Sequence, residues 1–128
     1  MENENSIKQV LVIDDEYAIR VLLKNFLETH NYEVELADCG KKVDTILETF
    51  QPELVITDIM MPEENGLSIV SRIRKTNPSI KVIYLSAWID EAETEKRLQK
   101  ELADYPRYIL MQKPFDLNTL LTTIKELA

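Results

Sequence analysis

The sequence is poor in several features that other classes of protein need. Its 128 residues contain one cysteine, Cys39, which excludes an internal disulfide and fits a reducing compartment such as the cytoplasm. Apolar runs such as residues 10–13 are far shorter than the roughly 20 residues of a membrane-spanning helix. The first residues lack the basic and then apolar pattern of a secretory signal. We therefore expect a soluble, cytoplasmic protein that does not enter a membrane.

Basic residues are also scarce relative to acidic ones. The chain has 15 lysines and arginines against 23 aspartates and glutamates, a formal net charge of −8. This balance argues against direct binding to nucleic acid or to an anionic membrane surface. With 45% hydrophobic residues the chain can bury a core, and its length predicts a single domain over residues 1–128.

Short runs rich in β-branched residues alternate along the chain with stretches of helical spacing. The runs predict buried strands at residues 10–13, 34–36, 54–57, 81–85 and 108–111. Apolar stripes predict helices around residues 19–27, 43–50, 69–73, 92–103 and 117–124. Strict alternation predicts an α/β fold, (βα)5, with a doubly wound five-stranded parallel sheet between two layers of helices.

Polar side chains follow four of the five predicted strands. Asp14 and Asp15 follow the first strand, Asp58 the third, Ser86 the fourth and Lys113 the fifth. In such a sheet the ligand site lies beyond the carboxyl ends of the strands, so these side chains should converge. Clustered carboxylates favour a hard cation such as Mg²⁺, and an ammonium and a hydroxyl suit phosphoryl oxygens. The set predicts phosphoryl transfer to a carboxylate.

Four motifs together carry a family resemblance. They are Val-Leu-Val-Ile-Asp-Asp-Glu (10–16), Thr-Asp-Ile-Met-Met-Pro-Glu-Glu-Asn-Gly-Leu (57–67), Leu-Ser-Ala (85–87) and Lys-Pro-Phe (113–115). In this order and at these spacings, the chain resembles the receiver domain of two-component response regulators of the chemotaxis-regulator type. The resemblance covers nearly the whole chain and implies the flavodoxin-like strand order 2-1-3-4-5.

The resemblance also implies roles for individual residues. Asp58 would accept a phosphoryl group from a sensor histidine kinase or a phosphotransfer protein, Lys113 would contact that group, and Ser86 would move toward it. The implied cofactor is Mg²⁺, held by Asp14, Asp15, Asp58 and the backbone carbonyl of Met60. The chain would then be a switch rather than an enzyme. It would act on a downstream protein through the surface of its fourth and fifth helices, or on an output domain that this chain lacks. A homodimer that forms on phosphorylation is a further possibility.

Two positions depart from the family pattern. The spacing of 27 residues from Ser86 to Lys113 is longer than usual, and the excess lies in residues 88–107. The aromatic residue usually found three positions before the lysine is Leu110 here. Tyr108 lies on the same face of a regular strand, so the switch aromatic is Tyr108 or none.

Two large side chains are expected to modulate the lifetime of the phosphorylated state. By resemblance, Met60 and Trp88 border the path of water toward a phosphoryl group on Asp58. Neither side chain can act as a base, and both are large enough to crowd water out. We therefore expect the phosphoryl group on Asp58 to be hydrolysed slowly.

Other interpretations fit the sequence less well. An FMN-binding flavodoxin would need a glycine- and hydroxyl-rich loop where Asp14 and Asp15 stand. A phosphatase with an aspartyl nucleophile would carry a further acid at the position of Met60. A degenerate receiver that acts only as a protein-binding scaffold would lack the intact Asp58. The only histidine, His30, is predicted to end a helix, and Cys39 to be a small, partly buried apolar residue. The sequence does not identify the kinase, the pathway or the downstream partner, and it does not tell a stand-alone regulator from part of a longer protein.

Overall fold

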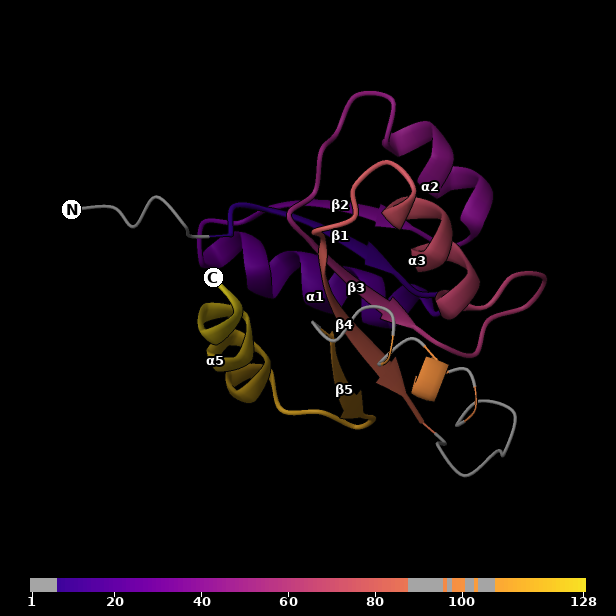
Figure 1. Cartoon of the computed structure of the whole chain (residues 1–128). Helices are drawn as coiled ribbons and strands as arrows, with labels where there is room; N and C mark the ends of the chain where they lie inside the picture. Colours follow the sequence, from indigo (N-terminus) through magenta and orange to yellow (C-terminus); the bar gives the residue numbers. More distant parts are fainter. Residues whose placement is uncertain (1–6, 88–95, 97, 101–102, 104–107) are drawn as a thin grey trace.

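The computed structural model describes residues 7–87, 96, 98–100, 103 and 108–128, and strands alternate with helices along them (Figure 1). The strands are β1 (Gln9–Ile13), β2 (Glu33–Ala37), β3 (Leu54–Asp58), β4 (Lys81–Ser86) and β5 (Tyr108–Gln112). The helices bounded within the described residues are α1 (Tyr17–Thr29), α2 (Gly40–Ile46), α3 (Gly66–Arg74) and α5 (Leu117–Leu127). Of the helix predicted at residues 92–103, the described residues 96, 98–100 and 103 are helical.

The five strands form one parallel sheet in the order β2-β1-β3-β4-β5. This confirms the doubly wound α/β fold and the flavodoxin-like strand order. Helices α2 and α3 lie side by side on one face of the sheet, and α1 and α5 lie on the other (Figure 1).

The core is divided in two by the alternation of side chains along the strands. On β1, Val10 and Val12 pack in a cluster with residues of α1 and α5, whereas Leu11 and Ile13 pack in a cluster with residues of α2 and α3. All four side chains are fully buried. A strand covered on both faces must be apolar on both, which explains the unbroken apolar run at residues 10–13.

Strand register brings the carboxyl ends of the central strands to one edge. Ile13 of β1 is paired with Thr57 of β3, and Asp58, the next residue, is paired with Leu85 of β4. Residues that directly follow these pairs therefore lie together at the edge of the sheet.

The end of α1 agrees with the prediction for His30. His30 is the C-cap of α1, and its ring lies 4.8 Å from the ring of Phe26 between centroids. Asp116 is the N-cap of α5, where its Oδ2 accepts hydrogen bonds from the Thr119 amide at 2.9 Å and the Thr119 hydroxyl at 3.1 Å. Cys39 is a half-buried free thiol at the N-cap of α2. Within the described residues, no helix has both the length and the apolar character needed to cross a bilayer.

We expect the Asp116 cap to contribute measurably to stability. Asp116→Ala removes the acceptor of both hydrogen bonds and should lower the free energy of unfolding by about 1 kcal/mol. Urea denaturation measures the change, and Asp116→Ser, which retains a short oxygen acceptor, should recover most of it. An alanine variant as stable as the parent would contradict this role.

Candidate functional site

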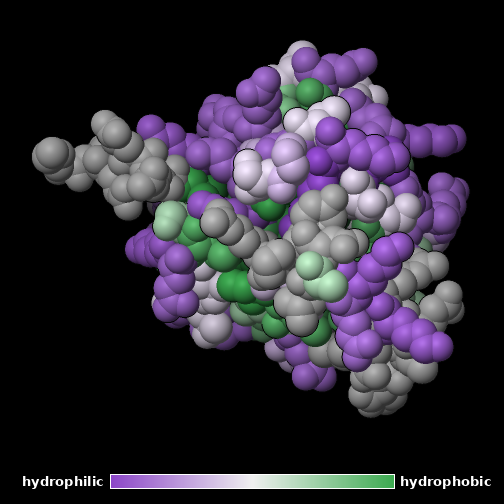
Figure 2. Space-filling view, viewed as in Figure 1, coloured by the Kyte–Doolittle hydropathy of each residue, from purple (hydrophilic) through white to green (hydrophobic). Residues whose placement is uncertain are grey.

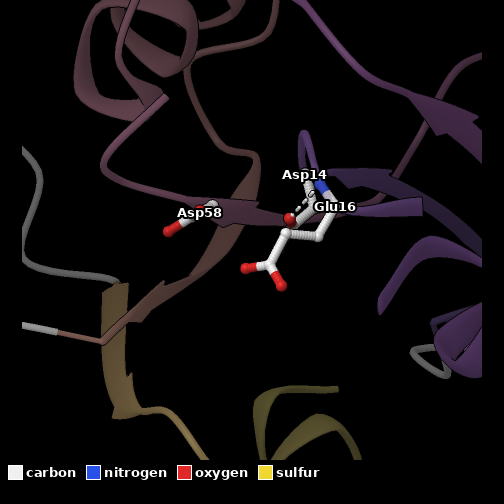
Figure 3. Close-up of side chains that lie close together, drawn as sticks. All are labelled: Asp14, Glu16 and Asp58. Carbon is white, nitrogen blue, oxygen red and sulfur yellow. Dashed lines mark hydrogen bonds between the residues drawn. The ribbon is translucent and has the colours of Figure 1, made fainter. Parts of the chain in front are cut away.

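Four of the predicted site residues end strands or directly follow them at one edge of the sheet. Asp14 directly follows β1, Asp58 is the last residue of β3, Ser86 the last residue of β4, and Lys113 directly follows β5. The parallel register therefore places them at a common edge, as the sequence predicts. Figure 3 shows Asp14 after β1 and Asp58 at the end of β3.

The Lys113 ammonium lies among three carboxylates. Its Nζ is 2.9 Å from Asp14 Oδ2, 3.3 Å from Glu16 Oε1 and 3.4 Å from Asp58 Oδ2. The side chains of Lys113, Asp14 and Asp58 are 11%, 0% and 8% exposed. Ionised groups that are so well buried need opposite charge and hydrogen bonds nearby, and here Lys113 supplies both to the two aspartates.

Asp14 is held by its backbone as well as by its side chain. Its amide donates to the Ala37 carbonyl at 3.1 Å, and its own carbonyl accepts from Arg20 Nη1 at 2.9 Å. Its Oδ1 accepts from the Glu16 amide at 2.8 Å, which closes a turn between β1 and α1. The Asp14 carboxylate is therefore fixed in position, with Oδ2 directed to Lys113.

Glu16 lies with Asp14 and Asp58 in one acidic group, although the sequence predicted no role for Glu16. Among the described residues, the carboxylates with one oxygen each within 4.8 Å of the others belong to Asp14, Glu16 and Asp58 (Figure 3). Asp15, which was predicted to bind Mg²⁺, has an exposed side chain and lies outside this group. The feature of the sequence that could have indicated Glu16 is its place as the third acid of the Asp-Asp-Glu motif.

Burial and neighbouring charge perturb the two central groups in ways that matter for chemistry. Burial raises the pKa of Asp58 from 3.8 to about 6, and the negative charges of Asp14 and Asp15 add to the rise, while Lys113 opposes it. Burial alone would lower the pKa of Lys113, but its hydrogen bond to Asp14 and the charges of Asp14 and Asp58 outweigh burial and raise it. The site therefore contains a firmly charged ammonium beside a carboxylate that is close to accepting a proton.

The backbone around Asp58 is tightly enclosed. The Thr57 hydroxyl donates to the Asp58 carbonyl at 3.0 Å, and the Gly66 amide donates to the Ile59 carbonyl at 2.9 Å. A Cβ atom on Gly66 would lie 2.1 Å from the Asp58 backbone oxygen, closer than any real contact. Glycine at this position thus lets the loop after β3 return across the end of the strand.

Ser86 and Lys113 are joined through the backbone. Ser86 is fully buried, and its carbonyl accepts a hydrogen bond from the Lys113 amide at 2.8 Å. This bond ties the end of β4 to the segment that carries the lysine, which precedes a cis peptide bond to Pro114. The predicted movement of the Ser86 hydroxyl stays a prediction.

Tyr108 lies on the same face of β5 as Leu110, as predicted, and at the start of the strand rather than at its carboxyl end. Tyr108 and Leu110 pack against the same apolar cluster, and the Tyr108 ring meets the buried Tyr84 ring edge-on at 5.7 Å between centroids. Strand register pairs Tyr108 with Val82, four residues before Ser86. A switching role for Tyr108 stays a prediction.

Of the two modulating residues, Met60 is 48% exposed in the loop after Asp58, and Trp88 lies outside the described residues.

Comparison with known proteins identifies the family. The sequence model of the response regulator receiver domain matches residues 10–125. The chain belongs to the response regulator receiver domain family. The acidic pocket of Asp14, Glu16 and Asp58 is consistent with the phosphorylation site of this family, and the resemblance predicted from the motifs is confirmed.

The curated relatives include much longer proteins. Response regulator MprA of Mycolicibacterium vanbaalenii is 31% identical over 119 residues, which cover 93% of this chain and 49% of that protein. Sensor kinase CckA of Brucella abortus is 32% identical over 120 residues, which cover 92% of this chain and 12% of that protein. The receiver unit thus spans half or less of these two relatives.

Solved receiver structures superpose over almost the whole chain. A CheY-like response regulator receiver domain protein from Methanospirillum hungatei has a TM-score of 0.81 and 28% identity, covering 94% of this chain and 93% of its own. Response regulator TrrA from Thermotoga maritima, solved in complex with Mg²⁺ and BeF, has a TM-score of 0.73 and 32% identity, covering 94% of this chain and 99% of its own.

The raised pKa of Asp58 predicts how stability changes with pH in metal-free buffer. The folded protein keeps a proton on Asp58 up to about pH 6, whereas the unfolded chain loses it near pH 4, so stability should fall as pH rises through this window. Asp58→Asn removes this linkage. Its unfolding free energy should match that of the parent near pH 4 and exceed it by roughly 3 kcal/mol well above pH 6.

Denaturation by urea with EDTA present, at several pH values, tests this expectation. Glu48→Gln changes an exposed carboxylate outside the acidic group and should follow the parent at each pH. A constant difference between Asp58→Asn and the parent across the range would show that Asp58 is not the linked group.

Proposed function

We propose that Asp58 accepts a phosphoryl group and that the chain acts as a two-component signalling switch. The observation that carries the proposal is the Lys113 ammonium between two buried carboxylates, Asp14 and Asp58, at the carboxyl edge of the sheet. A carboxylate oxygen of Asp58 would attack the phosphorus of a phosphohistidine donor. An O–P bond then forms, the P–N bond breaks, and its electron pair leaves with the imidazole nitrogen.

We propose Mg²⁺ as the cofactor because the donor set fits a hard cation. Three carboxylates face one ammonium, so the site carries excess negative charge, and their oxygens lie within 4.8 Å of one another. The proposed ligands are Asp14, Asp15, Asp58 and the Met60 carbonyl, as the sequence implied, with Glu16 added from the structure. When bound, Mg²⁺ would neutralise carboxylate charge and bind an oxygen of the phosphoryl group. The complex of TrrA with Mg²⁺ and BeF supports this choice.

Lys113 and Ser86 are proposed to respond to the phosphoryl group rather than to the cation. The ammonium now contacts Asp14 and Asp58, so it is within reach of an anion built on Asp58. Ser86 ends the neighbouring strand and is linked to Lys113 through the backbone. Movement of the two together would transmit the phosphorylated state to the surface around β4 and β5.

The proposed partners follow from the family and from the named relatives. A sensor histidine kinase or a phosphotransfer protein would donate the phosphoryl group in the cytoplasm. A downstream protein would bind through the surface of the fourth and fifth predicted helices, or residues 1–128 would form one receiver unit that controls an output domain elsewhere in a longer protein. The large side chains of Met60, two residues after Asp58, and of Trp88 are proposed to give a long-lived phosphorylated state. The last proposal is a homodimer of this chain that forms on phosphorylation.

Labelling with a small phosphodonor tests the acceptor. Acetyl phosphate with Mg²⁺ should add one phosphoryl group to the parent by intact mass, and EDTA should prevent it, because the dianionic donor must approach clustered carboxylates. Asp58→Asn should remove the adduct, while the control Asp44→Asn should keep it. Full labelling of Asp58→Asn would show that another residue is the nucleophile.

Repeated turnover separates the switch from a phosphatase. One stable adduct for each chain supports the receiver, whereas continuous release of phosphate from a phosphomonoester would support the phosphatase.

Replacing Lys113 tests the division of roles. Lys113→Ala should slow phosphorylation by an amount equivalent to ~2–4 kcal/mol of transition-state stabilisation, since a charge-assisted contact to the phosphoryl group is lost. Mg²⁺ affinity, measured by calorimetry, should not fall, because the substitution removes a positive charge next to the carboxylates. Circular dichroism checks that the variant is folded. Normal phosphorylation combined with weakened Mg²⁺ binding would reverse the assigned roles.

A further inference from the structure

A second group of charges lies on the α2–α3 side of the molecule, apart from the acidic edge. The Arg72 guanidinium on α3 contacts Asp44 on α2 through Nε at 3.1 Å and Nη2 at 3.4 Å. Its Nη1 donates to Glu64 Oε2, and its Nη2 also donates to the Gly40 carbonyl at 3.3 Å. Arg72 therefore joins α2, α3 and the loop that follows β3. Figure 2 shows that the surface over α2 and α3 is mostly hydrophilic.

The Glu64 end of this group is packed closely. Glu64 Oε2 also accepts from the Ser68 hydroxyl at 2.8 Å, and the Glu64 side chain is 29% exposed. A Cβ atom on Gly40 would lie 2.2 Å from Glu64 Oε1 and 3.0 Å from Arg72 Nη2. The ion pair thus lies directly against the backbone at the start of α2, and a larger residue at position 40 would displace the ends of these two side chains.

Glu64 belongs to the loop that leads away from the acceptor. This loop starts after Asp58 and returns at Gly66, whose amide donates to the Ile59 carbonyl and whose Cα lies against the Asp58 carbonyl. The loop also carries Met60. Within it, the Glu64 amide donates to the Pro62 carbonyl at 2.7 Å, so the Glu64 side chain extends from a hydrogen-bonded turn. Glu64 is therefore connected through this loop to the backbone around Asp58.

The two acidic partners of Arg72 differ in what they can hold. Asp44 connects Arg72 only to α2, and its side chain is 59% exposed. Glu64 connects Arg72 to the acceptor loop and is half as exposed. The pair Arg72–Asp44 can thus stabilise the packing of two helices, whereas the pair Arg72–Glu64 can also fix the loop.

We propose that Arg72 is a positioning residue that acts through Glu64 to hold the loop of residues 59–65 in place beside Asp58. The inference rests on the proposed function in one respect, because its chemical consequence is the lifetime of the phosphoryl group on Asp58. Hydrolysis needs a water in line behind the phosphorus, and by resemblance to the family Met60 borders that path, so a held loop would keep this side chain in place. Release of the loop opens the path and shortens the lifetime.

The test uses matched truncations at the two partners of Arg72. Glu64→Ala and Arg72→Met release the loop, whereas Asp44→Ala removes the other carboxylate and leaves the loop attached. In the unphosphorylated parent and variants, amide hydrogen exchange at Gly66 reports opening of the loop. After correction for global stability, exchange should be at least about fivefold faster in Glu64→Ala and Arg72→Met and near the parent rate in Asp44→Ala.

The lifetime of the phosphorylated state is the second measurement. After labelling with acetyl phosphate and removal of the donor, intact mass should show loss of the adduct at least about threefold faster in Glu64→Ala and Arg72→Met than in the parent and Asp44→Ala. The double variant Glu64→Ala/Arg72→Met should match the single variants, because both remove one connection. Equal effects of Asp44→Ala and Glu64→Ala, or unchanged Gly66 exchange, would overturn the proposal. Failure to label the parent would instead contradict the proposed function, and the exchange measurement would still decide the role of Arg72.

Discussion

Electrostatic repulsion among carboxylates is the constraint on which the arrangement of this molecule depends. Asp14 and Asp58 are both buried, and Glu16 lies beside them, so their charges would oppose folding if nothing offset them. Lys113 offsets them from the far side of the site. Its strand, β5, is separated from β3 by β4, and the ammonium still reaches Asp14 after β1. A long, flexible stem with a compact charge at its end is suited to this span, which explains why a lysine serves here.

The backbone of the site is held by close packing and hydrogen bonds, whereas its central positive charge is shared among several oxygens. Gly66, Thr57 and Ile59 enclose Asp58 through close packing and hydrogen bonds, and Asp14 is held by three further contacts. By contrast, the Lys113 ammonium divides its hydrogen bonds among several oxygens, and a change in protonation or a bound cation can redistribute them. A rigid frame around a redistributable charge lets a chemical event change local contacts without unfolding the edge of the sheet.

The sequence predicted the fold well because a parallel sheet covered on both faces leaves a strong periodic signal. Runs such as residues 10–13 differ clearly from the helical stripes, and register then brings Asp14, Asp58 and Lys113 to one edge. Local turn geometry was harder to predict. The Glu16 amide donates a hydrogen bond to Asp14, and Glu16 belongs to the acidic group, whereas Asp15 next to it lies outside the group; no periodicity in the sequence distinguishes the two.

Contacts between side chains distant in sequence were not predictable from the pattern either. Arg72 meets Asp44 and Gly40 across 28 and 32 positions, and an arginine on a helix surface gives no sign of which acids it will contact. The predicted roles of Tyr108 and Trp88 stay predictions for a different reason. The role of Tyr108 concerns a response to phosphorylation, which depends on free-energy differences between states rather than on a sequence pattern, and Trp88 lies outside the described residues.

The contact between Lys113 and Asp14 also has a consequence for synthesis of the protein. The two residues are separated by 99 positions, so the ribosome completes β1, β3 and β4 before the lysine emerges. Until then the nascent chain holds Asp14 and Asp58 without their neutralising partner, and these carboxylates favour a hydrated, open edge. The charge of the acidic edge is therefore compensated only after β5 has been made, and a translation product that ends before β5 would carry an uncompensated negative pocket.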